Sequence, residues 1–445
     1  MQRNLSLVTP HSAFCIVHYA LCIAALALTA TAAIPTTLEK NTDYVVNCET
    51  GAAPTKIFVE NSSLTLDNRS WVDFKDSRSD SQTNFFLHVT GGSVATNFNN
   101  FLKITNGGRI VVDGGSTLRL QSANYYMAAA GAKGVSMSVT NSSLFTGGNL
   151  VLNSFSNTLT LCNSRFSGSQ TLQISGLGNR FVVSGDCGTT PISLAVFTGT
   201  NNWVVLEDGA RLASTTTAKL QNGSAGPCGY HIGRNAFLFC GYSGLSAGNA
   251  GTSNGWVVVE EGGEFSVSNG DGDTCGLAGY DTRWILNNGT YSCSNNMVRV
   301  GNYSKHRGTR LELNGDDANF FAMNLRIGNT GNTTNLTIAL NPGAGAYGDR
   351  APLWSKRAVT FDGACVFEID LRAPLRARAA NEILRLPVVQ AAVDVSGSAF
   401  TLSTENLAKL NEQLVTQPPG GRLELDGKVL YCVMKRKATT VLAVR

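Results

Sequence analysis

Acidic side chains at two places in the sequence could do the chemistry that cuts a sugar chain. Asn41-Thr42-Asp43 lies near the start, and Gly315-Asp316-Asp317 follows about 270 residues later. Hydrolysis of a glycosidic bond needs two carboxylates at a set separation. The motifs GHG and RIK, which accompany such carboxylates in polygalacturonase-like enzymes, are absent from the sequence. We therefore interpret Asp316 and Asp317 as turn residues, and no catalytic residue is predicted.

Other residues that could bind a metal or act as nucleophiles are scattered. Asn269, Asp271 and Asp273 alternate oxygen ligands as a calcium loop does, but Tyr280 stands where the last acidic ligand would be. An Asp-Gly turn is the preferred interpretation. The chain has no HExxH motif, so a zinc site of that kind is not indicated. No metal and no cofactor is predicted.

The elements that would carry any site are short strands joined by tight turns. Apolar residues make up 43% of the chain and charged residues only 15%, while Gly accounts for 47 of 445 residues. This apolar content supports a folded core, and Gly with Asn, Ser and Thr supplies turns. From 350 to 445, 14 Lys or Arg stand against nine Asp or Glu. That surplus is spread out, so a nucleic-acid partner is not predicted.

A strand followed by a glycine turn recurs along most of the chain. Examples are FVVSG from Phe181, WVVLEDG from Trp203, WVVVEEG from Trp256 and WILNNG from Trp284. Successive phrases lie 22 to 28 residues apart, except for one interval of 53. The missing anchor in that interval is expected at Ile232 or Phe237.

A repeat of this length indicates a solenoid in which each unit buries its apolar face against its neighbours. Two or three short strands per unit, with period-2 alternation, predict an all-β fold, a right-handed parallel β-helix. Its coils would hold about 22–28 residues and span residues 34–350, giving a rod about 65 Å long. A set of hairpins packed as antiparallel sandwiches is the alternative.

Two units resemble a known repeat. VRVGNYSKHRGTRLELNG and LRIGNTGNTTNLTIALNPG are similar to the repeats of autotransporter-passenger and PEP-CTERM-associated proteins. The resemblance covers about residues 100–345 and implies a right-handed β-helix on an exported protein. The sequence ends VLAVR, without the last residues of an autotransporter barrel or the PEP-CTERM tail. The resemblance therefore implies the passenger-like body and neither family's export route.

Residues 1–33 are predicted to be a signal peptide. The apolar run AFCIVHYALCIAALALTA follows Arg3, and Ala30-Thr31-Ala32 forms a small-residue cleavage site. An uncleaved membrane anchor is the alternative. No second apolar run of spanning length follows. We expect a secreted or cell-surface protein without a further membrane span.

The nine cysteines after residue 33 form an odd, scattered set without CxxC, which is not typical of a small disulfide scaffold. We predict buried core thiols. A bridge such as Cys228 with Cys240 remains open.

Binding residues are expected on loops, because loops on a rigid scaffold usually carry recognition. The stretch from Ala213 to Asn254 is the longest irregular one, and it offers Tyr230, His231 and Tyr242 as ligand-binding candidates. The tryptophans that open three of the strands, Trp203, Trp256 and Trp284, are predicted to form an interior stack. The alternative is an outer aromatic strip that binds sugar rings.

Residues 351–445 are predicted to hold the last coils and a small α+β cap with one short helix. Ser403 or Thr404 can begin the helix, and Leu407, Leu410 and Leu414 share one face of it. A cap would cover the exposed end of the solenoid. A surface-docking module that uses Lys435-Arg436-Lys437 is the alternative.

These patterns favour a non-catalytic structural or adhesin-like protein. An extracellular polysaccharide is the expected partner class. The alternative function is a carbohydrate-binding or polysaccharide-degrading β-helix, a lyase or a hydrolase.

Overall fold

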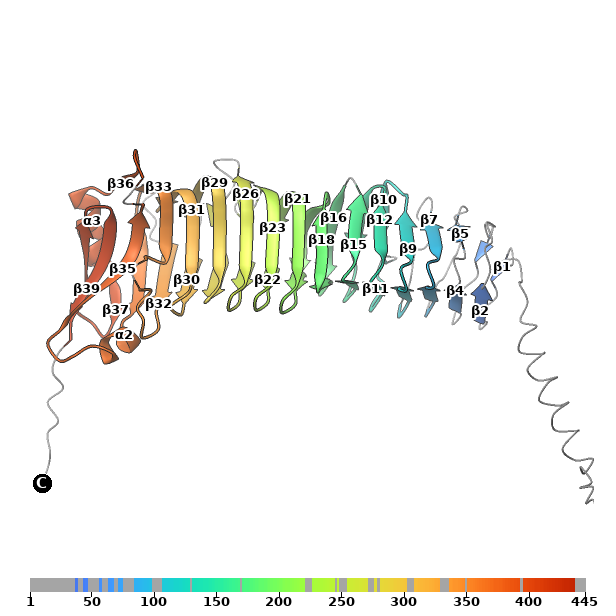
Figure 1. Ribbon diagram of the computed structural model, residues 1–445, viewed down its shortest axis with the longest axis horizontal. Coiled ribbons are helices and arrows are strands. Elements are labelled where there is room, and N and C mark those ends of the chain that lie inside the picture. Colours follow the sequence, from blue (N-terminus) through green and yellow to red (C-terminus); the bar gives the residue numbers. More distant parts are fainter. Residues whose placement is uncertain are drawn as a thin grey trace, which may run out of the picture.

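A computed structural model describes residues 37–38, 43–46, 56–57, 63–67, 71–74, 84–97, 106–128, 130–168, 170–220, 226–244, 246–247, 254–270, 276–277, 281–301, 308–328, 336–348, 350–392 and 395–436. In this part of the chain, stacked coils form a long rod, with the first strands at one end and two short helices at the other (Figure 1). The predicted signal peptide lies outside the described residues.

Two long sheets run along the rod. The first has 15 strands, one per coil: β2 (Asp43–Val46), β4 (Ser63–Leu66), β6 (Phe86–Val89), β8 (Arg109–Val112), β11 (Ser136–Thr140), β14 (Thr158–Cys162), β17 (Arg180–Ser184), β20 (Trp203–Leu206), β22 (Cys228–Ile232), β25 (Gly255–Val259), β28 (Arg283–Asn287), β30 (Thr309–Asn314), β32 (Leu336–Asn341), β34 (Val366–Asp370) and β37 (Val415–Gln417). Neighbours in this sheet pair in parallel, as the repeat predicts.

The second long sheet has 17 strands: β10 (Asn124–Tyr126), β13 (Asn149–Leu152), β16 (Thr171–Leu177), β18 (Asp186–Thr190), β19 (Ser193–Thr200), β21 (Arg211–Leu220), β23 (Phe237–Gly244), β24 (Ser246–Ala247), β26 (Glu264–Gly270), β27 (Gly276–Leu277), β29 (Thr290–Val300), β31 (Asn319–Ile327), β33 (Leu353–Phe361), β35 (Ile383–Ala391), β36 (Ala399–Thr401), β38 (Arg422–Asp426) and β39 (Val429–Lys435).

Two smaller sheets complete the first coils. One has five strands: β5 (Trp71–Phe74), β7 (Val94–Asn97), β9 (Thr117–Leu120), β12 (Ser143–Thr146) and β15 (Arg165–Gly168). The other pairs β1 (Thr37–Leu38) with β3 (Lys56–Ile57).

The register of the 15-stranded sheet confirms the repeat. Leu159 pairs with Phe181, 22 residues later, and Trp284 pairs with Leu311, 27 residues later. The missing coil is β22, whose Tyr230 pairs with Val204 before it and Val257 after it. Neither expected residue is the anchor, because Ile232 lies in β22 but pairs with Leu206, and Phe237 opens β23 in the other sheet. The parallel pairing also rules out the antiparallel-sandwich alternative for these coils.

Alternate side chains of each strand fill the interior. One inward column runs Leu159, Phe181, Val204, Tyr230, Val257, Trp284, Leu311, Ile338 and Phe367, each with 1% or less of its surface exposed. Stacking such columns coil on coil gives one continuous apolar core. That core stabilises the rod, since no single coil could bury its own apolar face.

Polar residues at the corners link one coil to the next. The buried amide oxygen of Asn179 accepts a hydrogen bond from the backbone N–H of Asn157 at 2.8 Å, and that of Asn202 accepts one from Asn179 at 2.9 Å. A serine ladder does the same elsewhere, with the Ser142 hydroxyl accepting from the Ser116 N–H at 3.1 Å. The ladders satisfy buried backbone donors, which explains why the chain is rich in Asn and Ser.

The C-terminal end departs from the coil pattern, as expected. β39 pairs antiparallel with both β35 and β38. The predicted helix is α3 (Thr404–Glu412), and the Ser403 side chain accepts a hydrogen bond from the Asn406 N–H. Within this helix, Leu410 is buried. A second short helix, α2 (Arg372–Arg376), was not predicted. The fold-class prediction, a parallel β-helix followed by a small α+β unit, is confirmed.

Candidate functional site

The outer face of the 15-stranded sheet, from β17 to β34, gathers side chains that could recognise a ligand. Because residues alternate along a strand, every second residue points outward, and parallel register stacks these residues into columns along the rod. One outward column, hereafter the aromatic column, is Arg180, Trp203, Gly229, Trp256, Arg283 and Arg310. A second column, at the other end of the same strands, contains Glu260, Asn287, Asn314 and Asn341.

The tryptophans divide between the two sides of the sheet. Trp284 is 1% exposed and packs edge-to-face on Tyr291, with ring centroids 4.5 Å apart. Trp203 and Trp256 are only half-buried and lie in the aromatic column. The interior stack is therefore confirmed for Trp284 and wrong for the other two. These belong to the outer strip that the alternative interpretation described.

Gly229 separates the two outer tryptophans. Each coil advances about 4.8 Å, so Trp203 and Trp256 stand about 9.6 Å apart along the rod, with no side chain between them. The Trp203 Nε1 donates to the Asn201 side chain at 2.9 Å. The Arg283 guanidinium lies 5.2 Å from the centre of the Trp256 ring. The coil spacing is close to the length of one pyranose unit in an extended polysaccharide, so this pair could engage two rings of one chain.

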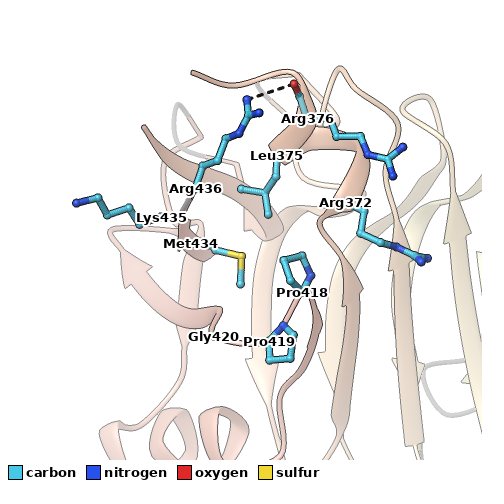
Figure 2. A pocket seen from close by; sticks show the side chains of 9 residues that line it. All are labelled: Arg372, Leu375, Arg376, Pro418, Pro419, Gly420, Met434, Lys435 and Arg436. Carbon is cyan, nitrogen blue, oxygen red and sulfur yellow. Dashed lines mark hydrogen bonds between the residues drawn. The ribbon is translucent and has the colours of Figure 1, made fainter. Parts of the chain in front are cut away.

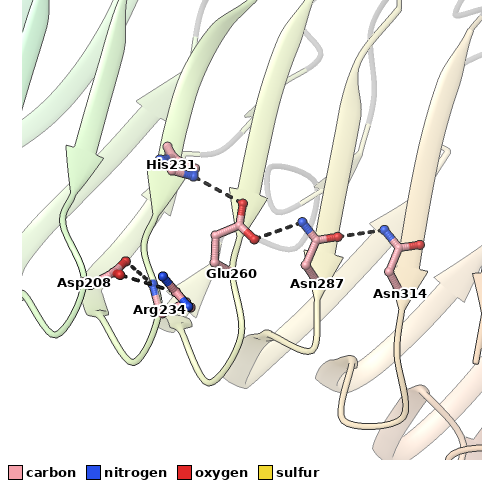
Figure 3. Close-up of polar contacts among 6 residues, drawn as sticks. All are labelled: Asp208, His231, Arg234, Glu260, Asn287 and Asn314. Atoms are coloured by element: carbon pink, nitrogen blue, oxygen red, sulfur yellow. Dashed lines mark hydrogen bonds and ion pairs between the residues drawn. The ribbon is translucent and has the colours of Figure 1, made fainter. Parts of the chain in front are cut away.

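A continuous polar line runs along the same face from β22 to β32, and Figure 3 shows it from His231 to Asn314. Starting from His231, hydrogen bonds connect Glu260, Asn287, Asn314 and Asn341 in order, with distances of 3.3, 3.1, 2.8 and 2.7 Å. His231 and Glu260 have 39% and 32% of their side chains exposed. Each amide in this line keeps one N–H that the line does not use. The line thus offers regularly spaced polar groups along the rod axis.

The His231–Glu260 contact repeats a pairing found near the other end of the rod. His88 Nε2 lies 3.0 Å from the Asp113 carboxylate, and the acid again follows the partner strand on the next coil. Burial opposes the charge on Asp113, but hydrogen bonds from Thr90 and His88 outweigh burial and lower the pKa of this carboxyl. A geometry that recurs in this way is a structural tie between coils, so His231 alone does not indicate acid-base catalysis.

Charged residues form one further cluster on the same face. Arg310 binds Glu312 and Glu368, with nitrogen–oxygen distances of 2.7 Å in both cases. Burial disfavours the charged form of Arg310, yet the hydrogen bonds to the two carboxylates raise its pKa. Arg310 therefore remains protonated and cannot serve as a general base. The cluster ties β30 to β34, since Arg310 and Glu368 are 58 residues apart in sequence.

The predicted binding residues are separated by the fold. Tyr230 is fully buried, and its hydroxyl donates to the Leu194 carbonyl at 3.0 Å, so no ligand reaches it. His231, the next residue, faces outward. Tyr242 lies in β23, and its side chain is outside the described residues. The expectation of a loop here is wrong where the structure describes it, because Tyr230 and His231 belong to the regular strand β22.

The sequence motifs weighed as catalytic or metal sites do not gather into one. The Asp316 carboxylate accepts a hydrogen bond from the Gly345 N–H at 2.9 Å, which is a corner contact between coils. Asp43 opens β2 at the other end of the rod. Asp271 and Asp273 lie outside the described residues. In the described ranges, no group of three or more His, Cys, Asp or Glu is arranged to hold a metal ion.

Six of the seven described cysteines are buried core residues, as predicted, whereas Cys162 is only half-buried. Cys228 and Cys240 are both fully buried free thiols and form no bridge with each other. Burial raises the pKa of Cys228 to about 12 and that of Cys240 further still. Neither thiol is therefore a nucleophile at neutral pH.

No known family model, curated protein or solved structure matches the chain. Among the helices of the described residues, none has both the length and the apolar character of a transmembrane helix. Function therefore has to be inferred from the geometry.

The outer aromatic strip was predicted only as the alternative, and the polar line was not predicted, although the sequence contains a signal for both. In the strands that begin at Trp203 and Trp256, an acidic residue follows four positions after the tryptophan, at Glu207 and Glu260. Residues four apart in a strand share a side, and a charged residue marks the solvent side. In the strand of Trp284, the outward set instead contains Arg283 and Asn287.

Proposed function

We propose that this protein is a secreted or surface-exposed, non-catalytic rod with an adhesin-like role, and that its binding face is the aromatic column. The observation that carries the proposal is the placement of Trp203 and Trp256 on the outer face, two coils apart, with Gly229 between them. Aromatic rings on a flat sheet offer apolar faces that stack on sugar rings, and the amides of the polar line, which begin one coil beyond Trp256, can bind the hydroxyls of further rings.

The rest of the face supports binding better than catalysis. Arg310 is held between Glu312 and Glu368, and Glu260 is held by His231 and Asn287. Each of these acidic groups already serves as a hydrogen-bond partner within the sheet. Binding an extended polysaccharide needs no change in these contacts, whereas a hydrolase would need a carboxylate free to exchange a proton.

The extracellular location rests on the apolar run before residue 34 and its small-residue cleavage site. Two measurements test these parts of the proposal. Protease shaving of intact cells that express the chain should release peptides of the rod. Incubation of the purified protein with acidic and neutral polysaccharides should produce no new reducing ends and no unsaturated products. Sustained release of either product would show a hydrolase or a lyase and contradict the proposal.

A further inference from the structure

The C-terminal end of the rod carries a pocket that differs in chemistry from the aromatic column. Its volume is about 900 Å³, and it lies between α2, the turn after β37 and the end of β39. Its nine lining residues are four basic residues (Arg372, Arg376, Lys435 and Arg436), four apolar residues (Leu375, Pro418, Pro419 and Met434) and Gly420. Among the described residues, no aromatic, amide or acidic side chain lines it.

The basic residues surround an apolar centre. Figure 2 shows the charged ends of Lys435, Arg372 and Arg376 directed away from Leu375 and Met434, whose side chains lie in the middle of the group. Pro418 and Pro419 are exposed beside them. Long basic side chains commonly extend this way at an interface, with the aliphatic stem on an apolar surface and the charge at its edge.

The charges are only partly balanced by acidic neighbours. Arg372 is paired with Asp370, with 2.9 Å between Nε and Oδ1, and this hydrogen bond lowers the pKa of Asp370. The Arg436 guanidinium donates to the Arg376 carbonyl at 3.4 Å. Arg376 and Lys435 have no direct ion pair with any described carboxylate. The group is therefore positively charged overall, and Lys437 follows it in the sequence.

We propose that this C-terminal pocket docks the rod, end first, on a membrane surface that contains anionic phospholipid. The basic ring matches the lipid phosphates, and the apolar centre matches the boundary between headgroups and acyl chains. An acidic polysaccharide fits less well, because sugar rings would find neither an aromatic face nor an amide in the lining. The position also fits, since β37 is the last strand of the 15-stranded sheet and Pro418-Pro419 follows it directly.

Flotation of the full chain with lipid vesicles tests this proposal. One set of vesicles contains phosphatidylcholine alone, and the other contains phosphatidylcholine with phosphatidylglycerol. The apolar run near the N-terminus would partition into both, so the difference between the two sets isolates binding that depends on lipid charge. We expect that difference to be large at low salt and to shrink in concentrated salt.

A double variant and a matched control locate the contact. Arg376→Gln with Lys435→Gln should lower partitioning onto the anionic vesicles about 30-fold, because each basic residue near the surface contributes about fivefold. Lys356→Gln with Arg357→Gln removes the same charge from exposed residues of β33 and should change it little. Circular dichroism shows whether both variants are folded.

Three results would overturn the proposal: no preference for anionic vesicles, an equal loss in both double variants, or binding to soluble polygalacturonate that is tighter than binding to anionic vesicles and that is lost in Arg376→Gln with Lys435→Gln. The last of these would show an acidic polysaccharide as the occupant. None of them bears on the aromatic column, so the proposed function would still stand.

Discussion

Replacing Trp284 with alanine should destabilise the rod far more than replacing Trp256, although each tryptophan is the second residue of its strand. Trp284 is 1% exposed and contacts Tyr291 and Phe320 in the interior, with ring centroids 4.5 and 5.9 Å away. Truncating a buried tryptophan to alanine costs about 3–5 kcal/mol. Trp256 is half-buried on the outer face and would lose mainly its contact with Arg283, worth about 0.5–1 kcal/mol.

Urea unfolding followed by circular dichroism measures this difference. A solenoid can unfold in parts, so hydrogen exchange of the peptides around β28 to β31 should accompany it. Trp284→Phe should recover part of the stability, because the buried Trp284 Nε1 has no hydrogen-bond partner among the described residues and phenylalanine leaves no polar group unpaired. A loss for Trp256→Ala as large as that for Trp284→Ala, or larger, would refute the register, because a slip of one residue would bury Trp256 and expose Trp284.

Three further predictions concern the core, the corners and acid stability. Gly148→Ala should lower the free energy of unfolding by about 3 kcal/mol, because a Cβ there would lie 2.1 Å from the Ala123 carbonyl oxygen. A Cβ at Gly115 would meet no atom within 4 Å, so Gly115→Ala should lower it by only about 1 kcal/mol, owing to the φ of +77° at that position. Thermal melts compare the two variants, and equal losses would contradict the coil packing. Thiol labelling read by mass spectrometry should modify Cys162 in the native protein while Cys228, Cys365 and Cys432, whose pKa values burial raises to about 12, react only after denaturation; early labelling of these three would contradict their burial. The melting temperature should fall as the pH drops below about 4, because the hydrogen bond from Arg372 lowers the pKa of Asp370 in the folded state below its usual 3.8. The stabilisation from this ion pair is therefore complete above pH 3.8 and is lost as the pH falls through the lower pKa of the folded state. Asp370→Asn should weaken this acid dependence, and an unchanged dependence would show that the pair of Arg372 and Asp370 does not stabilise the folded state.

The coil architecture could be predicted from the sequence because period and alternation are local signals. The spacing of Leu159, Phe181 and later anchors follows directly from the length of one coil. The side on which a tryptophan lies depends on the phase of the alternation, and a shift of one residue between β25 and β28 places Trp256 outside and Trp284 inside. The position of a repeat phrase in the sequence therefore does not predict which of its residues point inward.

The binding candidates show what composition alone cannot tell. The mixed polar and aromatic residues around Tyr230 predicted a loop. The core of the β-helix nevertheless buries Tyr230, because its hydroxyl donates a hydrogen bond to the Leu194 carbonyl. Helix α2 was not predicted because it contains a proline. Pro374 stands in its first turn, where a missing N–H removes no hydrogen bond.

Affinity electrophoresis through gels that contain polysaccharides tests the central claim most directly, namely that the aromatic column binds sugar chains without cutting them. The native chain should migrate more slowly in at least one gel, and staining of the polysaccharide should show no cleared zone. Trp203→Ala with Trp256→Ala should restore free migration, while Phe86→Ala, which removes an aromatic residue from the outer face of the same sheet at β6, should not. Unchanged migration of the native chain in every gel, or retardation that survives the double substitution, would contradict the claim.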